Sequence, residues 1–239
     1  MTVSTDVAAR LARLAAVYEL PVRAERQLAV LLDLVASEPA AITTVRDPAE
    51  GVDAHVADSL VALDVPAVRA ARRVADLGSG GGFPGLALAI ALPAAHVALV
   101  ESVGRKCAFL VQAAGELGLA NAEVVNARAE AWGDGLGAND LVVARALAPM
   151  PVLVEYAAPL LEPGGLLVAW KGRREAAEEA DAAAAAQALG MSTPEAIAVE
   201  PFPAARDRHL YLSSKVSATP SRYPRRPGMA RKRPIQASS

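Results

Sequence analysis

The chain has 239 residues, of which 53% are hydrophobic, 21% are charged and 4% are aromatic, and its formal net charge is −2. This length and apolar content suffice for one sizeable core with an appendage, and the single cysteine, Cys107, excludes internal disulfides and a cysteine-cluster metal site. The sequence has neither an apolar stretch typical of a signal peptide nor one of about 18 residues that favours a membrane span, so we expect a soluble cytoplasmic protein.

The first 72 residues have the pattern of a helical segment. Apolar residues recur at helical spacing over residues 7–20 and 25–35. Residues 39–44 break the pattern, and further helices are predicted over residues 53–63 and 65–71. We therefore interpret residues 1–72 as an N-terminal helical cap.

From Arg73 onward, short apolar strands alternate with helices. This alternation predicts an α/β fold in residues 73–215, with a seven-stranded, mostly parallel sheet covered by helices on both faces. The segment Glu162-Pro163-Gly164-Gly165 predicts a tight turn before a buried strand. The expected strands cover residues 73–77, 96–100, 122–125, 139–144, 165–170, about 195–200 and 209–214, and the expected helices cover residues 84–92, 103–118, 149–161 and 174–189.

Residues 216–239 form a basic, proline-rich tail. Residues 215–239 contain seven basic residues and no acid, which leaves 17 basic and 26 acidic residues in the rest of the chain. A basic tail on an acidic body favours a polyanionic partner, and an aromatic ring among arginines favours RNA, because both stack on bases. The alternative is a solvated tail, which its prolines keep from forming a helix. The candidate RNA-binding residues of the tail are Arg222, Tyr223, Arg225, Arg226, Arg231, Lys232 and Arg233.

A glycine-rich turn follows the first predicted strand, where the sequence from Asp76 to Gly85 is Asp-Leu-Gly-Ser-Gly-Gly-Gly-Phe-Pro-Gly. Such a turn lets a nucleotide-like ligand approach bare backbone at the start of a helix. The dinucleotide pattern G-x-G-x-x-G fails when it starts at Gly78, and it is met only from Gly80, several residues past the strand. The alternative is a turn that merely packs tightly, although five glycines in eight residues cost much backbone entropy.

Two acids stand at the ends of the first two strands. Asp76 precedes the glycines, where a carboxylate suits the ammonium and sulfonium groups of S-adenosylmethionine (SAM) better than the anionic pyrophosphate of NAD. Glu101 lies 23 residues after Gly78, close to the spacing of about 20 residues typical of a carboxylate that binds ribose hydroxyls. Its alternative role is that of an acid near a helix N-terminus. SAM is thus the favoured ligand, with Asp76, Gly78, Gly80 and Glu101 as candidate contacts, and an NAD(P)-dependent oxidoreductase is the alternative.

Two cations, Arg145 and Lys171, end neighbouring strands at the sheet edge where such folds bind ligands. The sequence after Arg145 lacks the Asn/Asp-Pro-Pro-aromatic pattern typical of methylation at exocyclic amines, and Cys107 lies on the wrong element to act as a nucleophile. These absences favour a ring nitrogen that already has a lone pair, which needs placement and no general base. Arg145 and Lys171 are therefore the candidate catalytic residues, positioned for a base oxygen, a phosphate or the SAM carboxylate. The alternative for Arg145 is an interdomain salt bridge, and the alternative for Lys171 is a solvated lysine at the end of a strand.

Three polar residues, His55, Asp58 and Ser59, are spaced three and four apart and share one face of a predicted helix. They suit the RNA side of the crevice, which makes His55 a candidate RNA-binding residue. The alternative is a hydrogen-bonded cluster that docks the helices on the sheet. We interpret His209 as structural, and the three histidines lack metal-ligand spacing, so we predict no metal.

A set of short motifs recurs in order along residues 25–235, and through them the chain resembles the bacterial 16S (small-subunit) ribosomal RNA guanine-N7 methyltransferases, the RsmG or GidB family. The glycine loop is common to many SAM enzymes, whereas the combination is specific. The chain departs from the family at residues 34–37 and 40–43, where members carry a Trp-Asn pair and a Tyr-Asn-Leu-Thr run. The motifs are Thr44-Val45-Arg46-Asp47-Pro48, His55 with Asp58-Ser59, residues 76–80 with Phe83-Pro84-Gly85, residues 101–106 with Phe109-Leu110, Arg145-Ala146, Lys171-Gly172, Arg208-His209-Leu210 and residues 223–228.

The resemblance implies a Rossmann-like SAM-dependent methyltransferase that modifies N7 of a guanine in 16S rRNA, with the rRNA or the small ribosomal subunit as its partner. It implies SAM contacts at Gly78, Phe83, Ala129, Glu130 and Arg145. We expect a monomer. A non-enzymatic alternative is a ribosome-assembly factor that binds RNA without catalysis. The intact glycine loop and Arg145 argue against this alternative.

Overall fold

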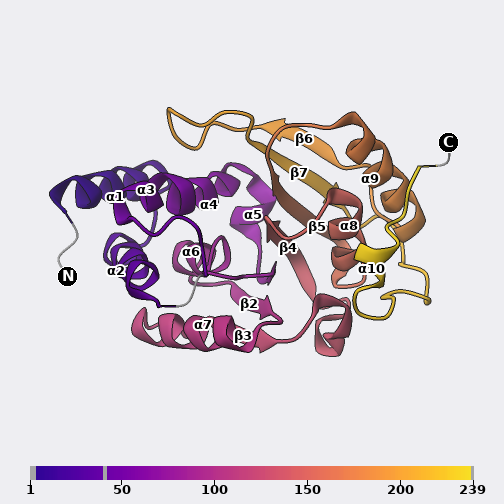
Figure 1. Cartoon of the computed structure of the whole chain (residues 1–239), viewed down its shortest axis with the longest axis horizontal. Helices are drawn as coiled ribbons and strands as arrows, with labels where there is room; N and C mark the ends of the chain where they lie inside the picture. Colours follow the sequence, from indigo (N-terminus) through magenta and orange to yellow (C-terminus); the bar gives the residue numbers. More distant parts are fainter. Residues whose placement is uncertain (1–3, 40–41, 238–239) are drawn as a thin grey trace.

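The computed structural model describes residues 4–39 and 42–237 (Figure 1). Ala40 and Ala41, which belong to the predicted break between helices, lie outside the described residues, as do positions 1–3 and 238–239 at the two ends. No helix in the described part of the chain is long and apolar enough to cross a membrane.

The N-terminal region is helical, as predicted. Its first helix begins after Ser4, whose Oγ accepts the N–H of Val7 at 3.4 Å. The helix predicted over residues 53–63 forms, but it opens with a π-helical turn, a form that is rare and frequent at functional sites. The elements are α1 (Thr5–Val17), α2 (Ala24–Ser37), α3 (Pro48–Gly51), η1 (Val52–Ala57), α4 (Asp58–Leu60), η2 (Val61–Asp64) and α5 (Pro66–Ala70).

Seven strands form one sheet in the order β3-β2-β1-β4-β5-β7-β6. The first five strands pair in parallel, and β7 runs antiparallel to both of its neighbours, which confirms the predicted architecture. The chain order reverses between β1 and β4, so ligands are expected beyond the carboxyl ends of these strands. The strands are β1 (Arg73–Leu77), β2 (His96–Glu101), β3 (Ala122–Asn126), β4 (Asn139–Arg145), β5 (Leu161–Lys171), β6 (Glu195–Ala198) and β7 (His209–Ser214).

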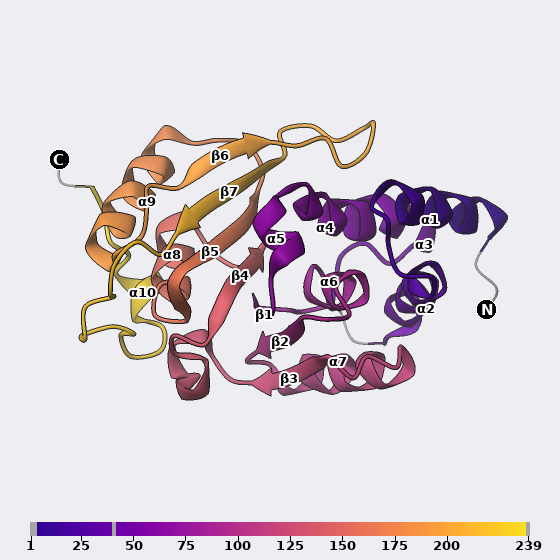
Figure 2. The ribbon, with the colours of Figure 1, turned by 180° about the vertical axis from the view of Figure 1, so that it is seen from behind.

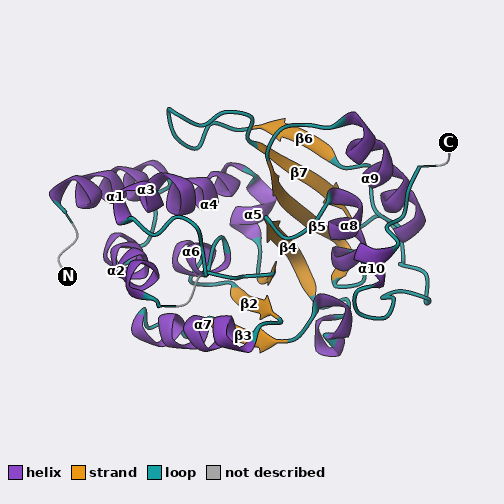
Figure 3. Cartoon of the chain, viewed as in Figure 1, coloured by secondary structure: helices purple, strands orange, loops and turns teal. Residues whose placement is uncertain are grey.

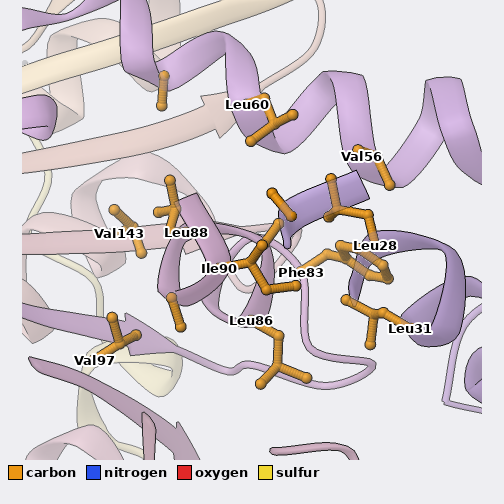
Figure 4. Close-up of a cluster of buried hydrophobic side chains, with 14 of the residues drawn as sticks. Leu28, Leu31, Val56, Leu60, Phe83, Leu86, Leu88, Ile90, Val97 and Val143 are labelled. Atoms are coloured by element: carbon orange, nitrogen blue, oxygen red, sulfur yellow. The ribbon is translucent and has the colours of Figure 1, made fainter. Parts of the chain in front are cut away.

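Helices cover both faces of the sheet (Figures 2 and 3). On one face, α6 (Gly85–Ala91) and α7 (Gly104–Glu116) share a hydrophobic cluster with the N-terminal helices, so that Leu28 and Leu31 of α2 belong to the same cluster as Leu86 and Leu88 (Figure 4). On the other face lie α8 (Met150–Ala157), α9 (Ala176–Leu189) and α10 (Met229–Lys232). The N-terminal helices are thus joined to the sheet by a common core, in which each buried leucine contributes about 1.5–3 kcal/mol.

The segment before the main part of β5 differs from the prediction. The helix expected over residues 149–161 ends at Ala157, and β5 already begins at Leu161. The predicted turn at 162–165 is an irregular part of that strand, because Gly164 donates its N–H to the carbonyl of Lys215 and Gly165 accepts the N–H of Lys215. A partner far along the chain supplies these bonds, and local sequence patterns do not reveal it.

The C-terminal tail folds back against α8 and α9 (Figure 1). Its prolines do not prevent the four-residue helix α10, so the prediction that the tail forms no helix is wrong. Tyr223 and the buried Ala230 pack into the cluster beneath α8 and α9, and Ala237 donates its N–H to Asp181 of α9 at 2.8 Å. The described part of the tail is therefore a folded element of the protein, which the sequence pattern did not indicate.

Candidate active site

The glycine-rich loop between β1 and α6 presents bare backbone at the crevice. Gly78 and Gly80 have φ of +72° and +54°, values that side chains rarely tolerate. A Cβ at Gly78 would lie 2.6 Å from Leu147 Cδ1, whereas a Cβ at Gly80 would meet only the Gly78 carbonyl, at 3.6 Å. The Gly80 N–H donates to Oε2 of Glu101 at 3.1 Å, which ties the loop to the end of β2.

Asp76 supports this loop from below. Its side chain is only 1% exposed, and its Oδ2 accepts the N–H of Gly85 at 3.0 Å. Burial raises its pKa to about 6, against the opposing hydrogen bonds from Ser79 and Gly85. Asp76 does not line any of the three cavities described below, and its contact with the ammonium and sulfonium groups of SAM stays a prediction. Its Oδ1 has no hydrogen-bond partner among the described residues.

A first cavity of about 390 Å³ lies at the carboxyl ends of β1, β2 and β4. It is lined by four of the predicted SAM contacts, Gly78, Glu101, Ala129 and Glu130, the last two from the short helix η3 (Ala129–Ala131). Oε1 of Glu101 accepts the N–H of Val103 at 2.9 Å, which fixes the carboxylate at the cavity edge. Further polar residues that line it include Ser102, Lys106 and Tyr156, which the sequence did not single out, and Arg231, which was predicted to contact RNA.

The first cavity fits the nucleoside part of SAM in its donor set. The carboxylate of Glu101 offers acceptors for ribose hydroxyls, and the glycine loop has no side chain that blocks a close approach. No phosphate-binding cation is needed for this ligand. Among the described residues, no group of three or more His, Cys, Asp or Glu side chains is arranged to hold a metal ion.

A second cavity of about 470 Å³ lies beside the first, beyond the ends of β4 and β5. A smaller space of about 260 Å³ lies between them and is lined by Gly78, Gly80, Phe83 and Arg145. The second cavity brings together His55, Arg145 and Lys171, which were predicted as site residues. Arg208 and Trp170 also line it and were not predicted as site residues. Its polar and aromatic lining includes Thr43, Thr44, His55, Asp58, Arg145, Trp170, Lys171, Arg208 and His209.

Arg145 links the sheet to the N-terminal helices and also lines both the second cavity and the connecting space. Its Nη1 lies 2.7 Å from Oδ2 of Asp58 and donates to the carbonyl of Ala54, in the π-helical turn, at 3.1 Å. Its guanidinium carbon lies 5.8 Å from the ring centroid of Phe83. The salt-bridge alternative is therefore what the structure contains, and the catalytic role of Arg145 stays a prediction.

His55 and Phe83 stack at the boundary between the helices and the loop, with ring centroids 4.7 Å apart. Nε2 of His55 lies 2.9 Å from the carbonyl of Val45 and 3.2 Å from Oγ1 of Thr43. Burial lowers the pKa of His55, so the ring is neutral at pH 7. These contacts fit the alternative role of His55, in a hydrogen-bonded cluster that docks the helices on the sheet. Although His55 also lines the second cavity, its side chain is mostly enclosed, and contact with RNA stays a prediction.

Lys171 is not a solvated lysine. Its Nζ lies 2.6 Å from Oε1 of Glu178 in α9, the same oxygen that accepts the N–H of Met150. His209 contacts the residue that follows β5, since its Nδ1 lies 3.0 Å from the carbonyl oxygen of Gly172. Lys171 therefore lines the cavity as part of an ion pair, and the carboxylate of Glu178 partly neutralises the positive charge that a substrate would meet.

The candidate RNA-binding residues of the tail fall into two groups. Arg225 forms a two-pronged ion pair with Glu155, which is 2% exposed, and Arg231 donates to the carbonyl of Leu147 at 2.6 Å. Arg225 is thus engaged inside the protein, which departs from the expectation of a free phosphate contact. Arg231 is itself exposed, and so are four other cations of the tail: Arg222, whose guanidinium lies 5.3 Å from the Tyr223 ring, Arg226, Lys232 and Arg233.

Solved structures with the same topology define the class of fold. The S-adenosylmethionine-dependent methyltransferase SibL, in its apo form, has a TM-score of 0.57 at 16% identity and covers 90% of this chain and 71% of its own. A SAM-dependent O-methyltransferase from Thermotoga maritima has a TM-score of 0.54 at 16% identity, with 78% and 71% covered. The protein thus has the predicted Rossmann-like methyltransferase fold.

Closer relatives define the family. Residues 25–210 match GidB, described as rRNA small subunit methyltransferase G. Ribosomal RNA small subunit methyltransferase G of Rubrobacter xylanophilus is 40% identical over 226 residues, covering 90% of this chain and 87% of that protein. The Roseiflexus castenholzii protein of the same name is 43% identical over 203 residues, with 81% and 83% covered. The chain therefore belongs to the rRNA small subunit methyltransferase G family, which confirms the resemblance and the prediction of a methyltransferase.

Proposed function

We propose that this chain transfers the methyl group of SAM to N7 of a guanine in 16S rRNA. The observation that carries the proposal is the meeting of two cavities at Gly78, Ala146 and Arg145, one with a nucleoside-type donor set and one open to a base. Family membership supports the reaction and the rRNA substrate. The choice of N7 rests on the family resemblance, with support from the missing exocyclic-amine motif after Arg145.

S-adenosylmethionine is the methyl donor, and it supplies an electrophilic methyl group on a sulfonium. Gly78 and Gly80 leave room for its close approach, and Glu101 offers acceptors for its ribose. Ala129 and Glu130 form the far side of that cavity. The role of these residues is to fix the donor so that its methyl group faces the connecting space.

The second cavity holds the base. A guanine N7 already has a lone pair, so the protein needs to orient the base and to exclude water, and no general base is required. Arg145, steadied by Asp58, and Lys171, steadied by Glu178, stand where they can interact with O6 or a phosphate. The neutral His55 stacked on Phe83 forms the wall on the helical side.

The exposed cations of the tail, together with Arg208 at the rim of the second cavity, supply the RNA phosphate contacts. We also propose that the protein acts as a monomer. Because ribosomal RNA is the substrate, the protein works in the cytoplasm.

The proposal is tested by single-turnover methyl transfer to 16S rRNA with labelled SAM. Arg145→Ala is expected to slow transfer by about 100-fold, because misplacement of a base by about 1 Å has an effect of that size. Arg173→Ala removes an exposed arginine that lines neither cavity and serves as the control, with an unchanged rate. If Arg145→Ala transfers the methyl group as fast as Arg173→Ala, Arg145 is not part of the reacting site.

A further inference from the structure

The C-terminal segment, residues 222–237, contributes Arg231 to the wall of the first cavity. Arg231 lines that cavity together with Glu130 and Tyr156, although the three residues lie far apart in the sequence. The N–H of Gly228 donates to Oε1 of Glu130 at 2.8 Å, and Nη2 of Arg231 donates to the carbonyl of Leu147 at 2.6 Å. The tail is thus bonded to both sides of the space that the family resemblance assigns to SAM.

A buried ion pair holds this wall in place. Nε of Arg225 lies 2.6 Å from Oε1 of Glu155, and its Nη2 donates both to Oε2 of the same carboxylate and to the carbonyl of Arg233. Glu155 lies almost fully buried in α8, and Arg225 is the one cation that forms an ion pair with it in the described part of the chain. Between these anchors, Gly228 adopts a φ of +85° and starts α10, which carries Arg231 to the cavity.

We propose that Arg231 is a cofactor-binding residue at the adenosine end of SAM, and that the Arg225–Glu155 pair positions it. The methyl group must face the second cavity, on the side of Gly78 and Ala146. The adenosine end then lies toward Ala129 and Glu130, and Arg231 lines the same cavity between Glu130, which is bonded to Gly228, and Leu147, whose carbonyl it contacts. A guanidinium plane is suited to stack on a base, which is the chemistry of this contact. The inference rests on the proposed use of SAM.

The test compares Arg231→Ala with Lys232→Ala, its sequence neighbour, which removes the same charge from the same helix without touching the cavity lining. Calorimetry measures the Kd of S-adenosylhomocysteine and of adenosine for the full-length variants. Arg231→Ala is expected to weaken both ligands by about tenfold, the size of one contact with a charged group. Lys232→Ala is expected to leave both Kd values unchanged, and the two variants are expected to lose the same affinity for 16S rRNA.

A second readout uses the unmodified protein. If a ligand in the cavity touches the tail, saturating S-adenosylhomocysteine slows trypsin cleavage after Arg231 and Lys232. Should Arg231→Ala fold poorly, Arg231→Lys keeps a donor and a charge but lacks the guanidinium plane, and it is expected to weaken both ligands as well.

Equal binding of S-adenosylhomocysteine by Arg231→Ala and Lys232→Ala would overturn the inference, and so would a loss confined to S-adenosylhomocysteine with adenosine unaffected. Unchanged tryptic cleavage in the presence of the ligand would count against it as well. Failure of the unmodified protein to bind S-adenosylhomocysteine is a different result, because it would remove the proposed function itself.

Discussion

Arg145 and Asp58 form an ion pair across 87 residues of sequence, with Nη1 and Oδ2 2.7 Å apart. The pair joins the end of β4 to the N-terminal helical run, and Trp170 of β5 adds a hydrogen bond from its Nε1 to the carbonyl of Asp58 at 2.6 Å. The two walls of the second cavity are therefore fixed to each other at the point where transfer is proposed. This explains why the helical segment and the sheet share one core.

Replacing Asp58 with asparagine tests this connection. Asp58→Asn leaves the largely buried guanidinium of Arg145 without its counter-charge, so unfolding in urea is expected to show a loss of about 1.5–3 kcal/mol. Methyl transfer is expected to slow as well, because Arg145 is no longer held in place. Asp64→Asn, at an exposed aspartate of the same helical run, is the control. Wild-type stability and rate in Asp58→Asn would show that the pair holds nothing together.

Gly78 is expected to be intolerant of any side chain for a reason specific to the site. In Gly78→Val, the new Cβ is forced toward Leu147 on the cavity wall and the residue keeps an unfavourable φ, so binding of S-adenosylhomocysteine is lost. Gly137→Val is the matched control, because Gly137 also has a positive φ (+61°) but has nothing within 4 Å of its virtual Cβ. Both variants are expected to lose about 1–3 kcal/mol of stability. Calorimetry of Gly137→Val should still show normal ligand binding.

The buried carboxyl of Asp76 makes stability depend on pH. Its pKa of about 6 in the folded protein lies above the value of about 3.9 in an unfolded chain. Between these values the folded protein binds the proton more tightly, so stability decreases as pH rises from about 4 to about 6 and then levels off. Asp76→Asn does not titrate and lacks this decrease, which amounts to about 3 kcal/mol at pH 7.

Urea unfolding of both proteins at pH 4.5 and pH 7 measures this difference. Asp76→Asn is expected to be more stable than the unmodified protein at pH 7 and close to it near pH 4, while its affinity for SAM is lower. Parallel stability curves for the two proteins over this range would mean that Asp76 is ionised without penalty.

The exposed cations of the tail are expected to serve RNA binding alone. A variant with Arg222, Arg226, Lys232 and Arg233 all replaced by alanine should lose affinity for 16S rRNA. The salt dependence of log K should become shallower by about 0.7 for each lost contact with a single-stranded phosphate. Filter binding at several salt concentrations measures the slope, and calorimetry should show unchanged affinity for S-adenosylhomocysteine. An unchanged slope would place the RNA elsewhere on the protein.

The succession of strands along the chain, the glycine loop and the acid Glu101 at a strand end were predictable, because each depends on short-range patterns. A parallel sheet produces alternating apolar runs, and a strained turn requires glycine where φ is positive. The position of Asp76 on the strand end was also evident. Its burial was not, because it depends on Gly85, whose missing side chain lets α6 close over the carboxylate.

The conformation of the tail was predicted wrongly, because the sequence shows the charges of the tail and does not show which residues it packs against. The Arg225–Glu155 pair and the bond from Gly228 to Glu130 connect residues 70 and 98 positions apart, and no local pattern predicts such contacts. The π-helical turn at Val52–Ala57 is a similar case. The carbonyl of Ala54 in this turn accepts a hydrogen bond from Arg145, so a contact with a distant residue accompanies the π-helical geometry.

The most direct test of the central claim is the position of the methyl group. Ribosomal RNA and small subunits from a strain lacking the corresponding enzyme are incubated with the purified protein and labelled SAM, and the modified nucleotide is mapped. The account predicts label on N7 of a single guanine in 16S rRNA, and none with Arg145→Ala at matched times. Label on an exocyclic amine, a ribose or a protein, with none on guanine N7, would contradict it.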